Sequence, residues 1–368
     1  MTDPGEQPGA GRERGCAGSL GKTGERMKLK WKSLACVLWT VLLAMGAAAP
    51  AGPVSKAEES AVEEWTVLEE KAWPELNDAG FLDQGEFVSE DPEEGIWRYC
   101  SGTLKIEIIR RTETEPVNLI WYEAEVWSRK ETFGFITNVP GKHFSEADWP
   151  VNVAVKNGAV LAINGDYASN RWNNMHYPKE RYKVGILLRD GEIRSSETKK
   201  SGNTSFPNLD TLAIYPDGNM EVHDSRELTA EEYLQRGAVD VLAFGPWLIR
   251  DGTVRDNLKR FATNNRNPRT AIGMIEPGHY IAIMVEGRTK QSRGCELTRL
   301  AQMMLDRGCR LALNLDGGET SCILFMGKQI CTVGNSHSKK GYARKEPEFL
   351  AIGISSLVEG YEQEKQTE

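Results

Sequence analysis

The chain has 368 residues, 40% of them hydrophobic, and a formal net charge of -8 at pH 7. A chain of this length and composition can bury a sizeable core, which excludes an intrinsically disordered protein. The acidic surplus argues against the basic surface that nucleic acids require, so no nucleic-acid partner is expected.

Residues 1–51 have the features of a targeting segment that precedes the fold. Met27 opens a second start with Lys28, Lys30 and Lys32, before an apolar run at 34–49 that ends in small residues. This order is typical of a secretory signal peptide, and the run is shorter than the ~20 residues of a membrane-spanning helix. The sequence therefore predicts a secreted protein, or an extracytoplasmic one held by an N-terminal membrane anchor.

Residues 52–94 are interpreted as a linker and a helical preface, because apolar residues recur at helical spacing between 61 and 82. From Gly95 onward the apolar runs are short and bounded by turn residues, which is the pattern of strands. Asp-Gly and Pro-Gly turns are expected at 190–191, 217–218, 251–252 and 277–278. Strands are expected at 104–109, 117–126, 159–164, 184–188, 211–215, 241–248, 271–275, 280–285, 311–315 and 323–326.

Two helices interrupt these strands. Thr229 and Glu232 form a capping-box pattern for a helix that ends near Gly237. The apolar face of residues 297–305 predicts a second helix, ended by Gly308. This balance predicts an α+β fold, with a mixed, mostly antiparallel sheet and a few helices in one large domain at 95–357, followed by a charged tail at 358–368.

Five cysteines lie outside the leader: Cys100, Cys295, Cys309, Cys322 and Cys331. Their spacing does not match a zinc site, and no histidine partner suggests a catalytic thiol. We interpret them as buried small hydrophobic residues, one pair of which can form a disulfide. The odd count leaves at least one thiol free.

Polar residues end the strand expected at 311–315. Alternation places Asn314 and Asp316 on one face, after which Gly317 and Gly318 turn the backbone sharply. Such groups either form an ordinary Asp-Gly turn or line a site, because their burial without partners is costly.

The strand at 159–164 ends in the same way, with Asn164 and Asp166 two residues apart. Two strand ends that offer Asn and Asp suggest a shared polar cleft. Carboxylates that converge there push each other's pKa values apart, which provides a general acid and a general base.

The strand at 280–285 leads into Glu286 and Arg288, and Arg269 lies just before its expected hairpin partner. The planar guanidinium of arginine can bind a phosphate with two hydrogen bonds. Arg269 alone could equally be a surface ion pair. Together with the polar strand ends, it favours a hydrolytic site that recognises an anion.

An ordered set of motifs carries a family resemblance. The set comprises Asn164-Gly165-Asp166-Tyr167, Gly245-Pro246-Trp247-Leu248 with Asp251-Gly252, Pro268-Arg269-Thr270-Ala271-Ile272-Gly273, Glu286-Gly287-Arg288, residues 297–300 and Asn314-Leu315-Asp316-Gly317-Gly318. It resembles the phosphodiester glycosidase family over roughly residues 104–355. The resemblance implies hydrolysis of a sugar-1-phosphodiester, with a carbohydrate phosphodiester as substrate, and the family includes exported proteins linked to exopolysaccharides.

The resemblance also implies roles for individual residues. Acid and base work would be shared among the carboxylates of Asp166, Glu286 and Asp316. The substrate would be bound by Asn164, Arg269, Thr270, Arg288, Asn314, Gly317 and Gly318. Among weaker candidates, His176 lies in a loop after the first motif, where it either contacts substrate or is an ordinary loop residue. Tyr167 and Trp172 either stack on a sugar ring or pack in the core.

Three positions depart from the family pattern. The family usually has a second glycine and an aromatic residue where this chain has Asp166-Tyr167, and an aspartate where it has Glu286. A Gly-Ser stretch is usual where this chain has Glu319-Thr320-Ser321. These differences bear on the choice of substrate more than on the class of reaction.

Other functions remain open from the sequence. One is a glycoside hydrolase that acts on an uncharged polysaccharide, and another is a non-catalytic surface protein that binds glycans. Turnover of an aryl-sugar phosphodiester, as opposed to binding without turnover, distinguishes them.

The pattern requires no cofactor. Asp166, Glu286, Asp316 and Asn314 nevertheless offer hard oxygen ligands suited to calcium or magnesium, and their spacing does not separate a metal site from a metal-free cluster. Loss of activity on chelation, restored by calcium, would decide between them.

Overall fold

Three antiparallel sheets form the framework of the structure, which confirms the prediction of a strand-rich chain with few helices. The computed structural model describes residues 73–129, 135–137, 148–165, 185–196, 208–261, 263–334, 341–346 and 348–362. All of these belong to the unit Val67–Glu368. Within these ranges, no helix is long and apolar enough to cross a membrane.

The largest sheet has nine strands, and its long hairpin shows why they form. Ile106 and Ile108 are buried while Lys105 and Glu107 are only partly buried, which is the period-2 pattern of a sheet with one covered face. The strands, in spatial order, are β1 (Phe87–Asp91), β2 (Ile96–Cys100), β3 (Leu104–Glu113), β4 (Leu119–Ser128), β15 (His279–Val285), β14 (Arg269–Glu276), β16 (Leu311–Asn314), β12 (Trp247–Arg250) and β13 (Thr253–Val254).

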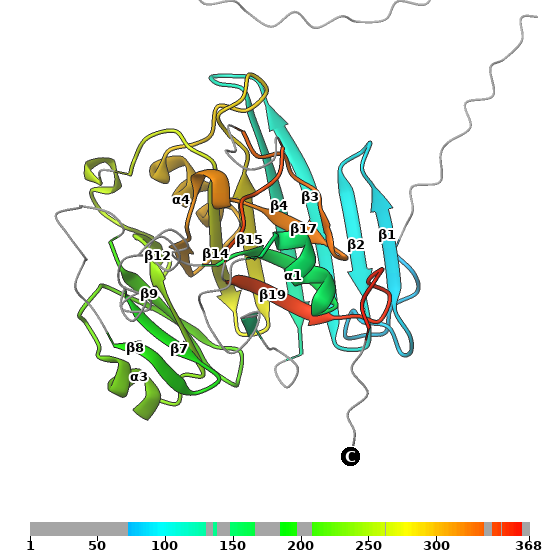
Figure 1. The fold of residues 1–368 in the computed structure, drawn as a ribbon, viewed down its shortest axis with the longest axis horizontal. Coiled ribbons are helices and arrows are strands. Elements are labelled where there is room, and N and C mark those ends of the chain that lie inside the picture. The colour runs from blue at the N-terminus through cyan, green and yellow to red at the C-terminus, as the bar shows by residue number, and fades with distance from the viewer. Residues whose placement is uncertain are drawn as a thin grey trace, which may run out of the picture. The chain divides into compact units, whose positions relative to one another are not determined.

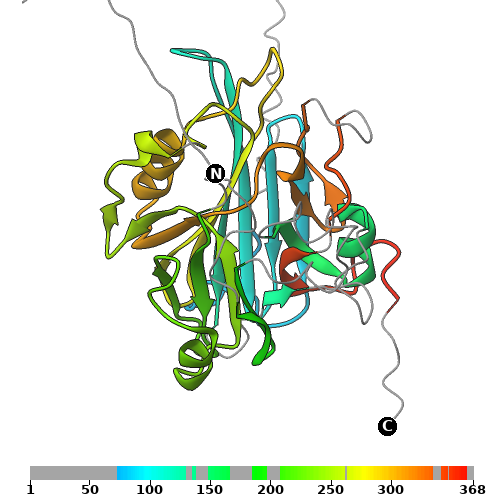
Figure 2. The same cartoon turned by 60° about the vertical axis from the view of Figure 1, so that its left-hand side comes forward.

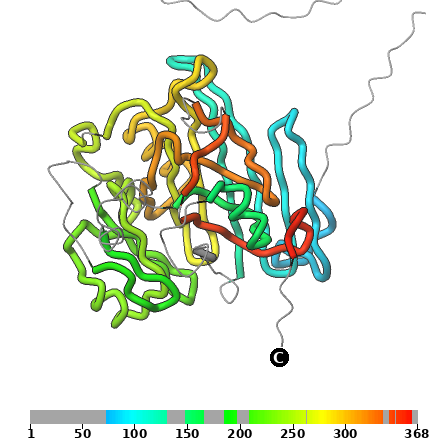
Figure 3. Tube along the Cα trace, in the orientation of Figure 1, coloured from blue at the N-terminus to red at the C-terminus, as the bar shows by residue number. Residues whose placement is uncertain are grey.

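Two five-stranded sheets complete the structure. The second sheet contains, in spatial order, β10 (Met220–His223), β9 (Asp210–Ile214), β11 (Asp240–Phe244), β7 (Ile186–Arg189) and β8 (Glu192–Ser196). The third contains β18 (Lys328–Gln329), β17 (Ile323–Phe325), β6 (Ala159–Asn164), β19 (Phe349–Ile354) and β5 (Phe135–Thr137). Figure 3 shows how the third sheet brings β19, near the C-terminus, beside the much earlier β6.

The two faces of the large sheet are covered differently (Figure 1). On one face, apolar residues of β3, β4, β14 and β15 pack against those of β6, β17 and β19. On the other face, α4 (Leu297–Asp306) packs through Leu297, Leu300 and Met304. Figure 2 shows α4 and the third sheet on opposite sides of the large sheet. Both faces are therefore buried along β14, β15 and β16, whose polar groups can reach solvent only at the ends of these strands.

The remaining helices are short. They are α1 (Pro150–Lys156), which contacts β6, α3 (Ala230–Gln235), which contacts β8, and the 3-10 turns η3 (Leu258–Arg260) and η4 (Gly318–Thr320). The capping box of Thr229 and Glu232 is present in α3, and Gly308 ends α4 with a φ of 82°, so both predicted helices are confirmed. The four expected turns are also present.

The strand expected at 241–248 is divided in the structure. Its first half is β11 in the second sheet, and its second half is β12 in the large sheet. Gly245 adopts a φ of 76°, and Pro246 has no N–H to donate, so an extended ladder cannot continue through them. The chain changes sheets at this pair.

The start of the fold also differs from expectation. Residues 73–82 form no helix, and the remainder of the expected helical preface, with the whole targeting segment, lies outside the described residues. Strand β1 falls inside 52–94 and pairs with β2, so the sheet begins at Phe87, before the expected boundary at Gly95. The helix α1 was not anticipated from the sequence.

Candidate active site

A buried amide joins three segments at one end of the large sheet. Asn164, at the end of β6, is fully buried, and its Nδ2 donates to the carbonyl oxygen of Asp316 at 2.9 Å. Its Oδ1 accepts from the hydroxyl of Thr270 at 2.6 Å and from the backbone N–H of Cys322 at 3.1 Å. The amide therefore connects β6 with β14 and with both ends of the β16–β17 connection.

The Asp316 carboxyl lies in that connection and is almost completely buried. Its Oδ1 accepts from the N–H of Gly317 at 2.8 Å, and its Oδ2 lies 3.5 Å from Nη2 of Arg344. The N–H of Gly318 donates to the Pro268 carbonyl at 3.1 Å, and a Cβ on Gly317 would lie 2.9 Å from that carbonyl oxygen. The first glycine is thus required by close backbone approach, which fixes the direction of the turn.

The second carboxyl, Glu286, follows β15 and is held by two donors. Its Oε1 accepts from the backbone N–H of Thr332 at 2.7 Å and from the hydroxyl of Tyr122 at 3.2 Å. Burial raises the pKa of Glu286 above its ordinary value, although both of these hydrogen bonds act in the opposite direction. Glu286 therefore keeps its proton to a higher pH than an exposed glutamate would, as suits a proton donor.

The predicted site residues share one end of the large sheet but divide between its two faces. The side chains of Thr270 and Ile272, two residues apart on β14, point to the face that the third sheet covers. Glu286 contacts Tyr122 on the same face. Asn314 pairs with Ala271, whose side chain lies on the face covered by α4. Only the open end of the sheet is accessible to both groups.

Arg269 differs most from what its sequence position suggested. Its Nε donates to the Cys295 carbonyl at 3.4 Å, and its Nη2 donates to the carbonyls of Asn265, at 2.7 Å, and Thr263. Its Nη1 makes no hydrogen bond to any residue that the structure describes. We expected two nitrogens of this guanidinium to bind a phosphate together. That arrangement is not available here, because Nη2, one of the two terminal nitrogens, already donates to backbone carbonyls.

Asn314 is also held by backbone, because its Nδ2 donates to the Gly245 carbonyl at 2.9 Å. Its Oδ1 is buried, and it has no hydrogen-bond partner among the residues described. The same holds for the hydroxyl of Ser321. Buried polar atoms without protein partners usually contact water or a ligand, so both atoms mark a polar lining near the Asp316 turn.

Two arginines border this turn. Arg288 has a φ of 60°, and its Nε and Nη2 donate to Oδ1 of Asn267 at 3.2 and 3.1 Å. A Cβ on Gly318 would lie 2.9 Å from Nη2 of Arg288, so this guanidinium lies directly over the turn. On the other side, the backbone N–H of Arg344 donates to the Glu319 carbonyl at 3.1 Å. Arg288 and Arg344 form a rim of two guanidinium groups, each of which has the planar geometry to bind an anion with two hydrogen bonds.

Sequence reasoning missed Tyr122 and Arg344. Tyr122 looks like an ordinary core aromatic in an alternating strand, and Arg344 lies in a basic loop without a motif. Four other candidates, Asp166, Tyr167, Trp172 and His176, fall outside the described residues. In the described part of the chain, no three His, Cys, Asp or Glu residues are close enough together to hold a metal ion.

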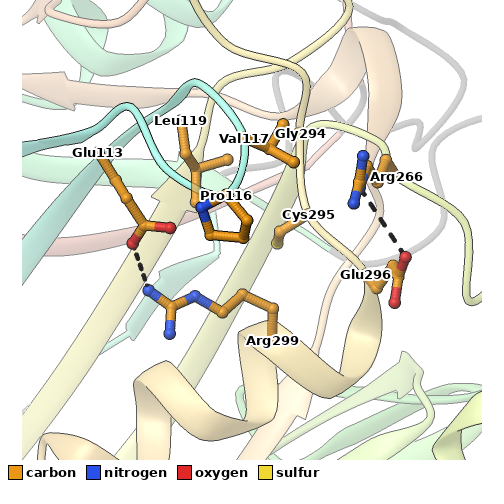
Figure 4. Close-up of a pocket in the computed structure, with 9 residues that line it drawn as sticks. All are labelled: Glu113, Pro116, Val117, Leu119, Arg266, Gly294, Cys295, Glu296 and Arg299. Carbon is orange, nitrogen blue, oxygen red and sulfur yellow. Dashed lines mark hydrogen bonds and ion pairs between the residues drawn. The ribbon is translucent and has the colours of Figure 1, made fainter. Parts of the chain in front are cut away.

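A separate cavity of about 240 Å³ is drawn in Figure 4. Cys295 lines it, and its charged groups are already paired, Glu113 with Arg299 at 2.6 Å and Arg266 with Glu296 at 3.8 Å. The cavity contains neither of the carboxyls described above. It is therefore not the candidate active site.

Comparison with known proteins agrees with the motif order. A model of a family described as phosphodiester glycosidase matches residues 157–352, more than half of the chain. The chain belongs to the phosphodiester glycosidase family. The matched region contains Asn164, Thr270, Glu286, Asp316 and Arg344, whereas strands β1 to β4 precede it.

Curated relatives of this phosphodiester glycosidase family member are distant. The Bacillus subtilis SPbeta prophage-derived uncharacterized protein YomE is 29% identical over 187 residues, which cover 50% of this chain and 27% of that protein. The human N-acetylglucosamine-1-phosphodiester alpha-N-acetylglucosaminidase is 28% identical over 153 residues, covering 37% and 29%. The bovine enzyme is 30% identical over 116 residues, covering 27% and 22%. The chain thus spans less than a third of each of these relatives.

Solved structures show that the fold is shared. The zebrafish N-acetylglucosamine-1-phosphodiester alpha-N-acetylglucosaminidase catalytic domain, auto-inhibited by its pro-peptide, aligns with a TM-score of 0.54 at 21% identity, covering 69% of this chain and 85% of that one. A hypothetical protein from Synechocystis aligns with a TM-score of 0.51 at 12% identity, covering 69% and 63%.

The Asn164 amide is the first feature to test. Asn164→Ala leaves the Thr270 hydroxyl, the Cys322 N–H and the Asp316 carbonyl without their partner in a dry site, so the free energy of unfolding should fall by about 3 kcal/mol or more. Urea denaturation measures this fall. Asn152→Ala is the control, because exposed Asn152 only donates to Asp148 at 3.0 Å. Equal stability of the two variants would show that the amide does not hold the three segments together.

Proposed function

We propose that this chain hydrolyses a sugar-1-phosphodiester outside the cytoplasm, in cell-envelope or extracellular glycans. Water would attack the anomeric carbon, the bond from that carbon to the phosphate oxygen would break, and the free sugar and a phosphomonoester would leave. Export is supported by the leader-like segment at 1–51. The reaction class is supported by membership of the family and by the named activity of the human and bovine relatives.

The observation that carries the proposal is the pair of buried carboxyls in different surroundings. Glu286 is held among Tyr122 and Thr332, and burial raises its pKa. Asp316 instead lies beside the guanidinium of Arg344. Two carboxyls in unlike environments can take unlike roles, one as proton donor and one as base or charge stabiliser. Asp166, two residues beyond Asn164, is a third candidate for this work.

The anion would be bound by the rim. Arg288 is partly exposed over Gly318 and has the planar geometry for two hydrogen bonds to phosphate. The buried Oδ1 of Asn314, with Thr270 and the Gly317-Gly318 backbone nearby, would orient the sugar. Arg269 would contribute a positive charge and one donor, its Nη1, because its other nitrogens already donate to backbone carbonyls.

The decisive assay uses an aryl N-acetylglucosamine-1-phosphodiester and, as control, the uncharged aryl glycoside of the same sugar. The proposal predicts turnover of the first, with aryl phosphate as product and with ¹⁸O from labelled water in the sugar. Turnover of the uncharged glycoside alone would favour a glycoside hydrolase. Binding without turnover of either would favour a glycan-binding protein.

The carboxyls can be tested in the same assay. Glu286→Gln and Asp316→Asn should each lower kcat by at least about a hundredfold, the usual contribution of a positioned acid or base. Circular dichroism and thermal melting establish that each variant is folded. Glu107→Gln is the matched control, because Glu107 on β3 pairs with Arg98 on β2, away from the site. Full turnover by a folded Glu286→Gln variant would remove that residue from the chemistry.

Replacement of Tyr122 tests whether Glu286 acts as a proton donor or as a base. The hydrogen bond from Tyr122 stabilises the Glu286 carboxylate and lowers the pKa, so Tyr122→Phe should raise that pKa further. If Glu286 donates a proton, activity falls as pH rises through its pKa, and the alkaline limb of kcat/KM should move to higher pH. If it is the base, the acidic limb should move upward instead. An unchanged profile would contradict both roles.

Replacement of either arginine, Arg288 or Arg269, by lysine keeps the positive charge, and the two variants distinguish a role in binding phosphate from a role in stability. Arg288→Lys should lower kcat/KM by about ten- to a hundredfold with little change in Tm, because lysine loses the bidentate geometry. Arg269→Lys should chiefly lower Tm, because one ammonium cannot replace Nε and Nη2 at separate carbonyls. Arg310→Lys, at the opposite end of β16, is the control. An Arg288→Lys variant with full kcat/KM would contradict the phosphate role.

A further inference from the structure

The hairpin of β17 and β18 has a regular register. Met326 and Gly327 have φ values of 47° and 78°, as a two-residue type I′ turn requires. Phe325 pairs with Lys328 and Leu324 pairs with Gln329. The N–H of Ile330 donates to the Ile323 carbonyl at 3.2 Å, which extends the pairing by one step.

The next pair in this register is Cys322 with Cys331. Hydrogen-bonded and non-hydrogen-bonded pairs alternate along an antiparallel ladder, so the cysteines follow the hydrogen-bonded Ile323–Ile330 pair at a non-hydrogen-bonded position. At such positions the Cα atoms lie ~4.5 Å apart, within the ~4.4–6.8 Å range of disulfides. The N–H of Ile323 also donates to Sγ of Cys331 at 3.4 Å. That sulfur therefore lies beside the peptide bond that joins Cys322 to Ile323.

We propose that Cys322 and Cys331 form a disulfide when the chain folds in an oxidising compartment. Both are free thiols in the structure, which is the reduced form of the pair. The oxidant is a small-molecule disulfide such as oxidised glutathione. Two S–H bonds are lost and one S–S bond forms, while the oxidant takes up two electrons and two protons and leaves as two thiols.

Burial determines when this bond forms. Burial raises the pKa of Cys331 to about 12 and raises that of Cys322 well above its usual value. Because the thiolate is the reacting species, the folded dithiol exchanges slowly with external disulfides. The bond therefore forms during folding, and the folded protein then shields it from reductants.

The disulfide would join the two segments that hold the site. The N–H of Cys322 donates to Asn164, and the N–H of Thr332, next to Cys331, donates to Glu286. A covalent link at the base of the hairpin fixes the separation of these two donors. The bond itself does not depend on the proposed activity, and its test needs no substrate.

The sequence allows a direct test on the full chain. Trypsin cleaves after Arg310, Lys328 and Lys339, so peptides 311–328 and 329–339 carry one cysteine each and separate unless a disulfide joins them. Chain refolded with oxidised and reduced glutathione is denatured, alkylated, digested and analysed by mass spectrometry. The joined, non-alkylated pair is expected, and it should disappear when reductant precedes alkylation. Recovery of both peptides alkylated, or joined to other cysteine peptides, would overturn the proposal.

Stability provides a second measurement. The oxidised wild type should melt about 5 °C above the reduced form, from the loop-closure entropy of a link across about ten residues. Cys322→Ala should abolish this difference, whereas Cys309→Ala, at a buried cysteine on the α4 side, should retain it. The same difference in wild type and Cys322→Ala would contradict the assignment. If Cys322→Ala does not fold, the peptide map of the wild type decides.

Discussion

The geometry of the site depends on a single buried amide. Asn164 lies at the end of a strand in the third sheet, yet its partners belong to the large sheet and to the β16–β17 connection. Its oxygen accepts two hydrogen bonds and its nitrogen donates to the Asp316 carbonyl, so little of its hydrogen-bonding capacity is unused. In a dry interior such a network is strong when complete and costly when one member is missing. The amide therefore determines where the Asp316 turn lies relative to both sheets.

The buried faces of β14, β15 and β16 impose a second constraint. Because α4 covers one face of β14, β15 and β16 and the third sheet covers the other, the polar groups of these strands are exposed only at the strand ends. Adjacent residues of one strand, such as Arg269 and Thr270, have side chains on opposite faces of the sheet, so they approach that end from opposite faces. One side supplies Glu286 with its raised pKa, and the other supplies a guanidinium held by backbone carbonyls. This division explains how adjacent residues of one motif can have unlike roles.

Much of this arrangement follows from local sequence patterns, and the rest requires the folded chain. Most of the expected strands and both predicted helices were found because their periodicity and caps are local signals. The break at Gly245-Pro246 was missed because apolar residues continue on both sides of it. Glu286 and Asp316 could be singled out as polar residues after apolar strands, whereas Arg344 approaches Asp316 only through tertiary contact. The contacts of Arg269 could not be predicted, because the carbonyls of Cys295, Thr263 and Asn265 that accept from its guanidinium reach it only in the folded chain.

Glu319, one of the residues that depart from the family pattern, contacts both rim arginines. Its Oε1 is 4.0 Å from Nη1 of Arg288, and its carbonyl accepts from the N–H of Arg344. The rim thus contains two arginines and, with Asp316, two carboxylates, so it has little net charge. The Arg288 side chain is 36% exposed and that of Glu319 only 11%, so this ion pair is partly buried. With so little net charge at the rim, hydrogen-bond geometry must contribute more than overall charge to the choice of ligand.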